Sequence, residues 1–246
     1  VIFSTADNSF PIWAENNTIR IWDINTGECL RILEGHTYSV WAIAFSPDGL
    51  TLASGSADTT IKIWNIHTGE CIRTLTDHKN FVWSVAFSPD GKILASGSED
   101  NTIKIWNFNT GECLYTLEGH TKQIYSVKFR PVCTESSQKI ENLLVSGSGD
   151  MTVKLWNVDR GICQDTLKHG HTAPIRSVSF SVDGNLLASG SEDENIQLWD
   201  VRTCSRLKQL KSKRLYEGME ITGISGLTDA EKASLKALGA VEKIEQ

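Results

Sequence analysis

The sequence has 246 residues, of which 40% are hydrophobic and 22% are charged, as is typical of a soluble globular protein. Its net charge of −6 offers no basic field to a phosphate backbone, and it contains no apolar run long enough to cross a bilayer. We therefore expect no nucleic-acid partner, no membrane attachment and a cytoplasmic location. No signal peptide is visible, but the chain begins with Val1, so a processed leader is an alternative.

One pattern organises the chain from its first residues to about residue 210. Its clearest copy is ASGSEDNTIKIWN at residues 95–107. The tryptophan of this pattern recurs at spacings of 42, 42, 50 and 43 residues, at Trp22, Trp64, Trp106, Trp156 and Trp199. A period near 42 residues predicts a repeat architecture in which each unit is one supersecondary element.

Each repeat predicts four short strands joined by tight turns. In the third repeat the strands are expected at 82–88, 94–98, 102–106 and 113–117. Pro89-Asp90-Gly91 separates the first two strands, because proline presets one φ angle and glycine supplies a positive one. The third strand alternates polar and apolar residues with the period of two that is typical of a strand.

The repeat register predicts five units followed by a tail. The units are 1–35, in which the start of the first strand is missing, then 36–77, 78–118, 119–169 with an insertion at 130–142, and 170–211. The tail, 212–246, contains a predicted helix near 228–239. Thr228 and Glu231 form a capping box for it, and Gly239 is a suitable stop.

The ends of each unit carry a family resemblance. A Gly-His dipeptide, as at Gly35-His36, is followed after about 28 residues by Trp-Asp or Trp-Asn, and Asp77-His78 is a variant of the opening. This pattern resembles the WD-repeat family of β-propellers. The resemblance implies an all-β fold whose blades are four-stranded antiparallel sheets around a central channel.

Family propellers usually have six to eight blades, so five repeats favour part of a larger or open propeller, with a closed five-bladed ring as the alternative. The tail resembles the C-terminus of bacterial WD-repeat proteins that are often joined to NTPase signalling modules.

Four polar or aromatic residues recur together in the repeats: His36, Ser54 (or Ser56), Asp58 and Trp64 in the second unit. Ser, His and Asp together could form a nucleophilic triad, but four copies, each with its own indole, favour a structural role. In the family these residues form a buried hydrogen-bonded network, so we predict no catalytic residues. The other copies are His78, Ser96, Asp100, Trp106, His120, Ser146, Asp150, Trp156, His171, Ser189, Asp193 and Trp199.

Residues that vary between repeats are the candidates for binding. By the family's geometry they lie near the top face, where Trp, Tyr and Arg side chains would form a protein-binding rim. The alternative is that the tryptophans only pack between blades. Glu99 and Glu192 would favour a partner with basic residues. The predicted rim comprises Trp41, Trp83, Tyr125, Arg176, Ser39, Phe81, Gln123, Glu99 and Glu192.

Five of the six cysteines recur once per repeat, at Cys29, Cys71, Cys113, Cys163 and Cys204. Such residues lie about a repeat apart, which is too far for a disulfide. The sequence contains no CxxC pair, so it gives no sign of a metal site. We expect them to be small buried packing residues, with no metal and no cofactor.

The sequence thus predicts a non-enzymatic scaffold that binds other proteins or peptides. One alternative is the sensing domain of a larger signalling NTPase, although no phosphate-binding loop occurs in this sequence. A propeller enzyme acting in the channel would need a polar cluster that is not repeated, and none is visible.

Overall fold

The computed structural model describes residues 9–13, 17–131, 142–168, 170–211, 228–237 and 241. The chain divides into two compact units, Val1–Gln209 and Leu210–Gln246. Most of the predicted insertion at 130–142 lies outside the described residues, as do Gly239, the side chain of Glu231 and the beginning of the first repeat.

Nineteen strands are described in the first unit and the residues directly after it. They form one three-stranded sheet, β1-β2-β3, and four four-stranded sheets, β4 to β7, β8 to β11, β12 to β15 and β16 to β19. The strands are β1 Ser9–Trp13, β2 Ile19–Asp23, β3 Cys29–Leu33, β4 Val40–Phe45, β5 Thr51–Ser56, β6 Thr60–Asn65, β7 Cys71–Thr76, β8 Val82–Phe87, β9 Ile93–Ser98, β10 Ile103–Asn107, β11 Cys113–Leu117, β12 Ile124–Phe129, β13 Leu143–Ser148, β14 Val153–Asn157, β15 Ile162–Leu167, β16 Ile175–Phe180, β17 Leu186–Ser191, β18 Asn195–Asp200 and β19 Arg206–Lys211.

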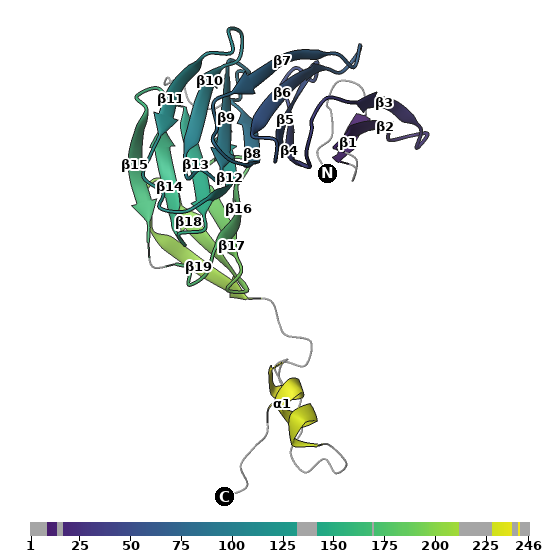
Figure 1. Ribbon diagram of the computed structural model, residues 1–246. Helices are drawn as coiled ribbons and strands as arrows, with labels where there is room; N and C mark the ends of the chain where they lie inside the picture. The colour runs from purple at the N-terminus through teal and green to yellow at the C-terminus, as the bar shows by residue number, and fades with distance from the viewer. Residues whose placement is uncertain are drawn as a thin grey trace, which may run out of the picture. The chain divides into compact units, whose positions relative to one another are not determined.

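Neighbouring strands within a sheet pair antiparallel, as in β4 with β5 and β5 with β6. The structure therefore confirms an all-β, propeller-like fold of antiparallel sheets. Successive sheets pack in chain order through their first strands, since β8 contacts both β4 and β12, and β12 contacts β16 (Figure 1). The fourth strand of each complete sheet lies at the opposite edge (Figure 1).

The hydrophobic core is divided among the interfaces between successive sheets. At one of them Ile103 and Ile105 of β10 pack in a cluster with Ile124 and Val127 of β12, and all four side chains are buried. This follows from the alternation in the sequence, because every second residue of a strand points to the same face. The three sheets β4 to β7, β8 to β11 and β12 to β15 each bury one face against the sheet before and the other against the sheet after.

Turns in the structure use the glycines that the sequence places in them. Gly49 and Gly91, which close the Pro-Asp-Gly turns, have φ angles of 73° and 71°. The turn between the second and third strands differs, because Thr59 adopts a φ of 71° without being glycine. A β-branched residue in this region is strained, so the surrounding turn must hold it there.

The cysteine prediction was wrong for the four cysteines at the first or second position of β3, β7, β11 and β15. Cys29, Cys71, Cys113 and Cys163 are exposed, and only Cys204 is half-buried. Their strand is the outermost of each sheet, so most of its residues face solvent, as in β11, where only Leu117 is buried. No disulfide joins these five described cysteines.

The second unit contains one described helix, α1, at Asp229–Ala237. Its first turn is closed by the Lys232 amide, which donates to the carbonyl of Thr228 at 3.0 Å. No helix in the described part of the chain is long and apolar enough to cross a membrane.

Candidate functional site

In each complete sheet a hydrogen-bonded network links the second and third strands, the turn between them and the loop before the first strand. In the second repeat Trp64 Nε1 donates to Ser54 Oγ at 2.8 Å, and Ser54 Oγ lies 2.7 Å from His36 Nε2. The other ring nitrogen of His36 lies 2.7 Å from a carboxylate oxygen of Asp58. Of the two serines considered, Ser54 is the one in the network, since Ser56 Oγ donates to the Tyr38 carbonyl.

The same geometry recurs in the other three complete repeats. The distances there are 2.7–2.9 Å, through His78, Ser96, Asp100 and Trp106, through His120, Ser146, Asp150 and Trp156, and through His171, Ser189, Asp193 and Trp199.

Donor and acceptor chemistry sets the direction of this network. An indole N–H can only donate, so the serine hydroxyl accepts from tryptophan and donates to His Nε2, and His Nδ1–H donates to the aspartate. Burial alone would raise the pKa of Asp58, but hydrogen bonds from His36, Thr60 and the Thr37 amide outweigh it and hold that pKa well below its usual range. Burial lowers the pKa of His120, which favours the neutral imidazole that the network requires.

The network serines have no access to a substrate. Ser54, Ser96, Ser146 and Ser189 are each 0% exposed. A nucleophile must be reached by its substrate, so this geometry supports a structural role. Each network satisfies buried polar groups, and each of these would cost about 1–3 kcal/mol if left without a partner.

In the described part of the first repeat this network does not form. Trp22 Nε1 is buried, and no hydrogen-bond partner for it lies among the described residues. The strand register explains why, because Ile12 pairs with Arg20 as Ser54 pairs with Lys62. An isoleucine therefore occupies the position of the serine that accepts from tryptophan elsewhere.

In the third repeat Asp77 replaces the glycine that precedes the network histidine, and it forms an ion pair. Gly35 and Gly119, in the same place, have φ angles of 148° and 140°, whereas Asp77 has no positive φ. The Asp77 carboxylate instead pairs with Lys104, whose side chain is 9% exposed. The hydrogen bond and charge of Lys104 lower the pKa of Asp77.

The four first-strand rim residues share one backbone feature. Val40 pairs with Ser56 and Ala42 with Gly55, so Trp41 is the extra residue of a β-bulge. Trp83, Tyr125 and Arg176 occupy the same bulge in β8, β12 and β16. Since a bulge re-aims a side chain out of the regular alternation, it explains how these residues leave the core face.

These bulge residues form a continuous row across four sheets, which we call the rim ladder (Trp41, Trp83, Tyr125 and Arg176). The ring centroids of Trp41 and Trp83 lie 5.0 Å apart, and those of Trp83 and Tyr125 5.7 Å apart. The Arg176 guanidinium lies 3.8 Å from the centroid of the Tyr125 ring. Trp83, Tyr125 and Arg176 thus each contact the ring of the preceding repeat. The ladder side chains therefore pack between repeats and are also partly exposed to solvent.

Loop residues hold the ladder in place. The Trp83 indole donates to Glu99 at 2.5 Å, Gln123 Nε2 donates to the Tyr125 hydroxyl at 2.6 Å, and Arg176 Nε donates to Glu192 at 2.7 Å. The same backbone bond joins the two loops in each of the four complete repeats. The amides of Ala57, Glu99, Gly149 and Glu192 donate to the carbonyls of Ser39, Phe81, Gln123 and Pro174.

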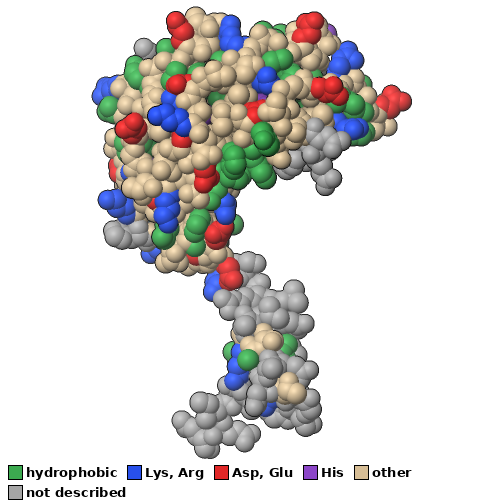
Figure 2. All heavy atoms as spheres, in the orientation of Figure 1, with side chains coloured by type: hydrophobic (Ala, Val, Ile, Leu, Met, Phe, Trp, Pro, Cys, Tyr) green, Lys and Arg blue, Asp and Glu red, His purple; other side chains and the backbone are tan. Residues whose placement is uncertain are grey.

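These hydrogen bonds also engage the acidic side chains beside the ladder. Glu99 and Glu192 were expected to favour basic residues, but both carboxylates are already bonded within the chain. Two of the aromatic rings add exposed apolar surface: Trp41 is 47% exposed and Phe81 is 41% exposed. Hydrophobic side chains gather on this side of the array, over β4, β8 and β12 (Figure 2).

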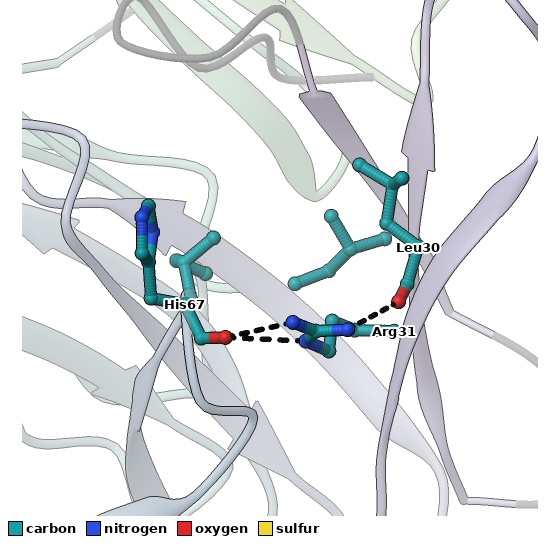
Figure 3. Close-up of a pocket in the computed structure, with 5 residues that line it drawn as sticks. Leu30, Arg31 and His67 are labelled. Atoms are coloured by element: carbon teal, nitrogen blue, oxygen red, sulfur yellow. Dashed lines mark hydrogen bonds between the residues drawn. The ribbon is translucent and has the colours of Figure 1, made fainter.

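A separate hollow lies between the first two sheets. It is lined by Ile21, Leu30, Arg31, Ile66 and His67 (Figure 3). Arg31 donates twice to the His67 carbonyl, at 2.9 and 3.2 Å, and once to the Leu30 carbonyl (Figure 3). Arg73 donates likewise to the Phe108 carbonyl at 2.8 Å between the next two sheets. The hollow therefore lies beside an arginine–carbonyl contact that recurs between successive sheets.

Within the described part of the chain, no group of three or more His, Cys, Asp or Glu side chains could hold a metal ion.

Comparison with known proteins identifies the repeat. The family model for the "WD domain, G-beta repeat" matches residues 27–65, 69–107, 111–157 and 161–200. The chain is 64% identical over 36 residues to an uncharacterized WD repeat-containing protein of Nostoc sp., which is 15% of this chain and 2% of that protein.

Two further similarities are to the fungal nuclear distribution protein PAC1. The chain is 44% identical to the Arthroderma otae protein over 46 residues, 19% of this chain and 10% of the relative. It is 49% identical to the Mycosarcoma maydis protein over 41 residues, 17% of this chain and 9% of the relative. The matched stretches thus span a tenth or less of the length of these relatives.

Proposed function

This chain belongs to the WD-repeat family, whose members generally mediate protein–protein interactions, and we propose that it is a non-enzymatic scaffold that binds a protein or peptide on its rim ladder. The observation that carries this proposal is the unbroken contact from Trp41 through Trp83 and Tyr125 to Arg176. Three aromatic rings and an arginine held rigidly at a surface are the residue types that dominate interface energetics.

The chemistry of the ladder favours an apolar segment in the partner. Trp41 and Phe81 offer exposed rings, and the neighbouring carboxylate of Glu99 is engaged by Trp83. A bound side chain that covers these rings would remove apolar surface from water without having to displace a charge. Polar loop residues such as Ser39 surround the rings and suit the rim of an interface.

A cytoplasmic location is part of this proposal. Exposed thiols at Cys29, Cys71, Cys113 and Cys163 persist without disulfide partners most readily in a reducing compartment.

The test uses two variants outside the core, one in the ladder and one at Phe81, whose ring packs against Trp83, and we call both ladder variants. Trp41→Ala and Phe81→Ala each remove an exposed ring, whereas Ile72→Ala on the outer strand β7, 54% exposed, removes a comparable amount of apolar surface elsewhere. Proteins captured by the wild-type chain are identified by quantitative mass spectrometry, and the affinity of the recovered partner is then measured directly.

We expect each ladder variant to weaken partner binding by 10-fold or more, since truncating an interface hot spot costs about 2 kcal/mol or more. Ile72→Ala should bind as wild type does, and all three variants should melt within a few degrees of it. Equal binding by the ladder variants and wild type would show that the partner binds elsewhere, and equal loss in all three would show a non-specific effect.

A further inference from the structure

The hollow between the first two sheets has an apolar base and a polar mouth (Figure 3). Ile21 and Ile66 form the base and are 1% and 5% exposed. Leu30, Arg31 and His67 surround the opening and are all exposed. The volume of the hollow is about 190 Å³. Sites for whole small molecules usually enclose about 300–1,000 Å³, so this hollow has the size for one side chain of a partner.

The next two interfaces between sheets each hold an aromatic ring in the corresponding region. Phe108 occupies the position of Ile66 in the third repeat, and its ring packs against the core cluster between the second and third sheets. Tyr115 occupies the position of Arg31, and a β-carbon at Gly161 of the fourth sheet would lie 2.7 Å from its ring. The shorter side chain of Ile66 leaves space at the first interface, and its neighbours show that a ring suits this part of the fold.

The polar groups at the mouth of the hollow are hydrogen-bond donors. Arg31 has five N–H groups, of which three donate to the carbonyls of Leu30 and His67. These acceptors are neutral, and no carboxylate in the described part of the chain pairs with the Arg31 guanidinium. The imidazole of His67 also has no partner among the described residues. A carboxylate from a partner would therefore find a cation that lacks a counter-ion, and such charge-assisted bonds are roughly twice as strong as neutral ones.

We propose that this hollow is a second peptide-binding site, which takes an aromatic side chain and an adjacent carboxylate from a partner protein, as in a Phe-Glu segment. The ring packs on Ile21 and Ile66, and the carboxylate pairs with Arg31. A basic segment would be repelled by Arg31, and an uncharged one would leave the guanidinium without a counter-ion. The site shares no residue with the rim ladder, so it does not depend on the function proposed for that surface.

The test titrates short peptides into the ¹⁵N-labelled protein and follows amide shifts by NMR. The probes are terminally blocked peptides that carry Phe-Glu, Phe-Gln or Ala-Glu between identical Gly-Ser flanks. We expect the Phe-Glu peptide to shift the amides of Arg31 and His67 with a Kd on the order of 1 mM, since a short flexible peptide loses much of its binding energy to ordering. The Phe-Gln and Ala-Glu peptides should bind several-fold more weakly.

Two variants test the location of the site. Ile66→Phe places the side chain of the next interface in the hollow, and Leu30→Glu adds a carboxylate that competes for Arg31. Each should weaken binding of the Phe-Glu peptide by about 10-fold or more, because each blocks the central contact. Ile72→Glu is the matched control for Leu30→Glu, since Ile72 holds the same position in the next repeat and is 54% exposed against 41% for Leu30. It should bind as wild type does.

Several outcomes would overturn the proposal. They are equal affinity for the Phe-Glu and Phe-Gln peptides, unchanged binding by Leu30→Glu or by a folded Ile66→Phe variant, and the absence of shifts at about 10 mM peptide. If Ile66→Phe does not fold, Leu30→Glu against Ile72→Glu decides, because both positions are exposed. Shifts confined to Trp41 and Phe81 would place the peptide on the ladder instead. A dimer of the wild-type protein that Leu30→Glu dissociates would make a second copy the occupant.

Discussion

The indole N–H of Trp83 donates to the carboxylate of Glu99 at 2.5 Å, which joins a first-strand bulge to the loop that precedes the network residue Asp100. This bond fixes the plane of the indole against Trp41 on one side and Tyr125 on the other. Trp83 is therefore the central member of the rim ladder, and its orientation depends on a residue from another loop.

Removing the donor should loosen the ladder without disturbing the core. We expect Trp83→Phe to lower the free energy of unfolding by about 1 kcal/mol, because the hydrogen bond is lost while both groups can reach solvent. Glu99→Gln keeps an acceptor and should cost less. Chemical denaturation measures both values, and a cost above about 3 kcal/mol for Trp83→Phe would show that the indole is a core residue.

Sequence reasoning was strongest where the repeats are most alike. The period predicts strands and sheets because residues such as Trp64 and Trp106 occupy the same environment 42 residues apart. The predicted burial of Cys71 was wrong. Alternation shows which residues share a face of a strand, but it does not show that β7 is the outermost strand. The bond of Glu99 to Trp83 was equally invisible, because it depends on how closely two loops approach.

The unpartnered indole of the first repeat gives a second prediction. Trp22→Phe removes an N–H that has no described partner, so we expect the free energy of unfolding to change by less than about 1 kcal/mol. Trp64→Phe is the matched control. It breaks the bond to Ser54 inside a buried network and should cost about 2 kcal/mol. Similar losses in the two variants, measured by urea denaturation, would contradict this assignment.

Stability should fall in acid in two stages. The pKa of His120 is lowered from 6.5 by burial, so folding disfavours its protonation and stability declines as pH falls below about 6.5. The pKa values of Asp58, Asp100 and Asp150 are lowered from 3.8, so their contribution is complete above that value and is lost as pH falls below it. Urea titrations between pH 8 and 3 measure both stages. His120→Gln should flatten the first stage, and an unchanged slope there would contradict the assignment to this imidazole.

Removing either partner of the ion pair between Lys104 and Asp77 should lower the stability by a different amount. Asp77→Asn leaves a largely buried ammonium without its carboxylate, so we expect a loss of about 1 kcal/mol, moderated because Asp77 is half-exposed. Lys104→Met removes the buried charge and keeps an apolar stem, so it should cost little. In the Lys104→Met background, Asp77→Asn should have almost no effect. A double-mutant cycle of unfolding free energies measures this coupling, and strict additivity would show that the pair contributes nothing.

Cysteine labelling tests the order of the strands within a sheet. Cys29, Cys71 and Cys163 are exposed on outer strands, so we expect maleimide to modify them in the folded protein at pH 8 within minutes. Cys204 is half-buried, and its burial raises the pKa of its thiol to about 11, which leaves little of the reactive thiolate at that pH. Its labelling should be slower by 10-fold or more. Peptide mass spectrometry resolves each site, and denatured protein provides the control in which all rates converge. Slow labelling of the three outer-strand thiols would mean that another molecule or segment covers that edge.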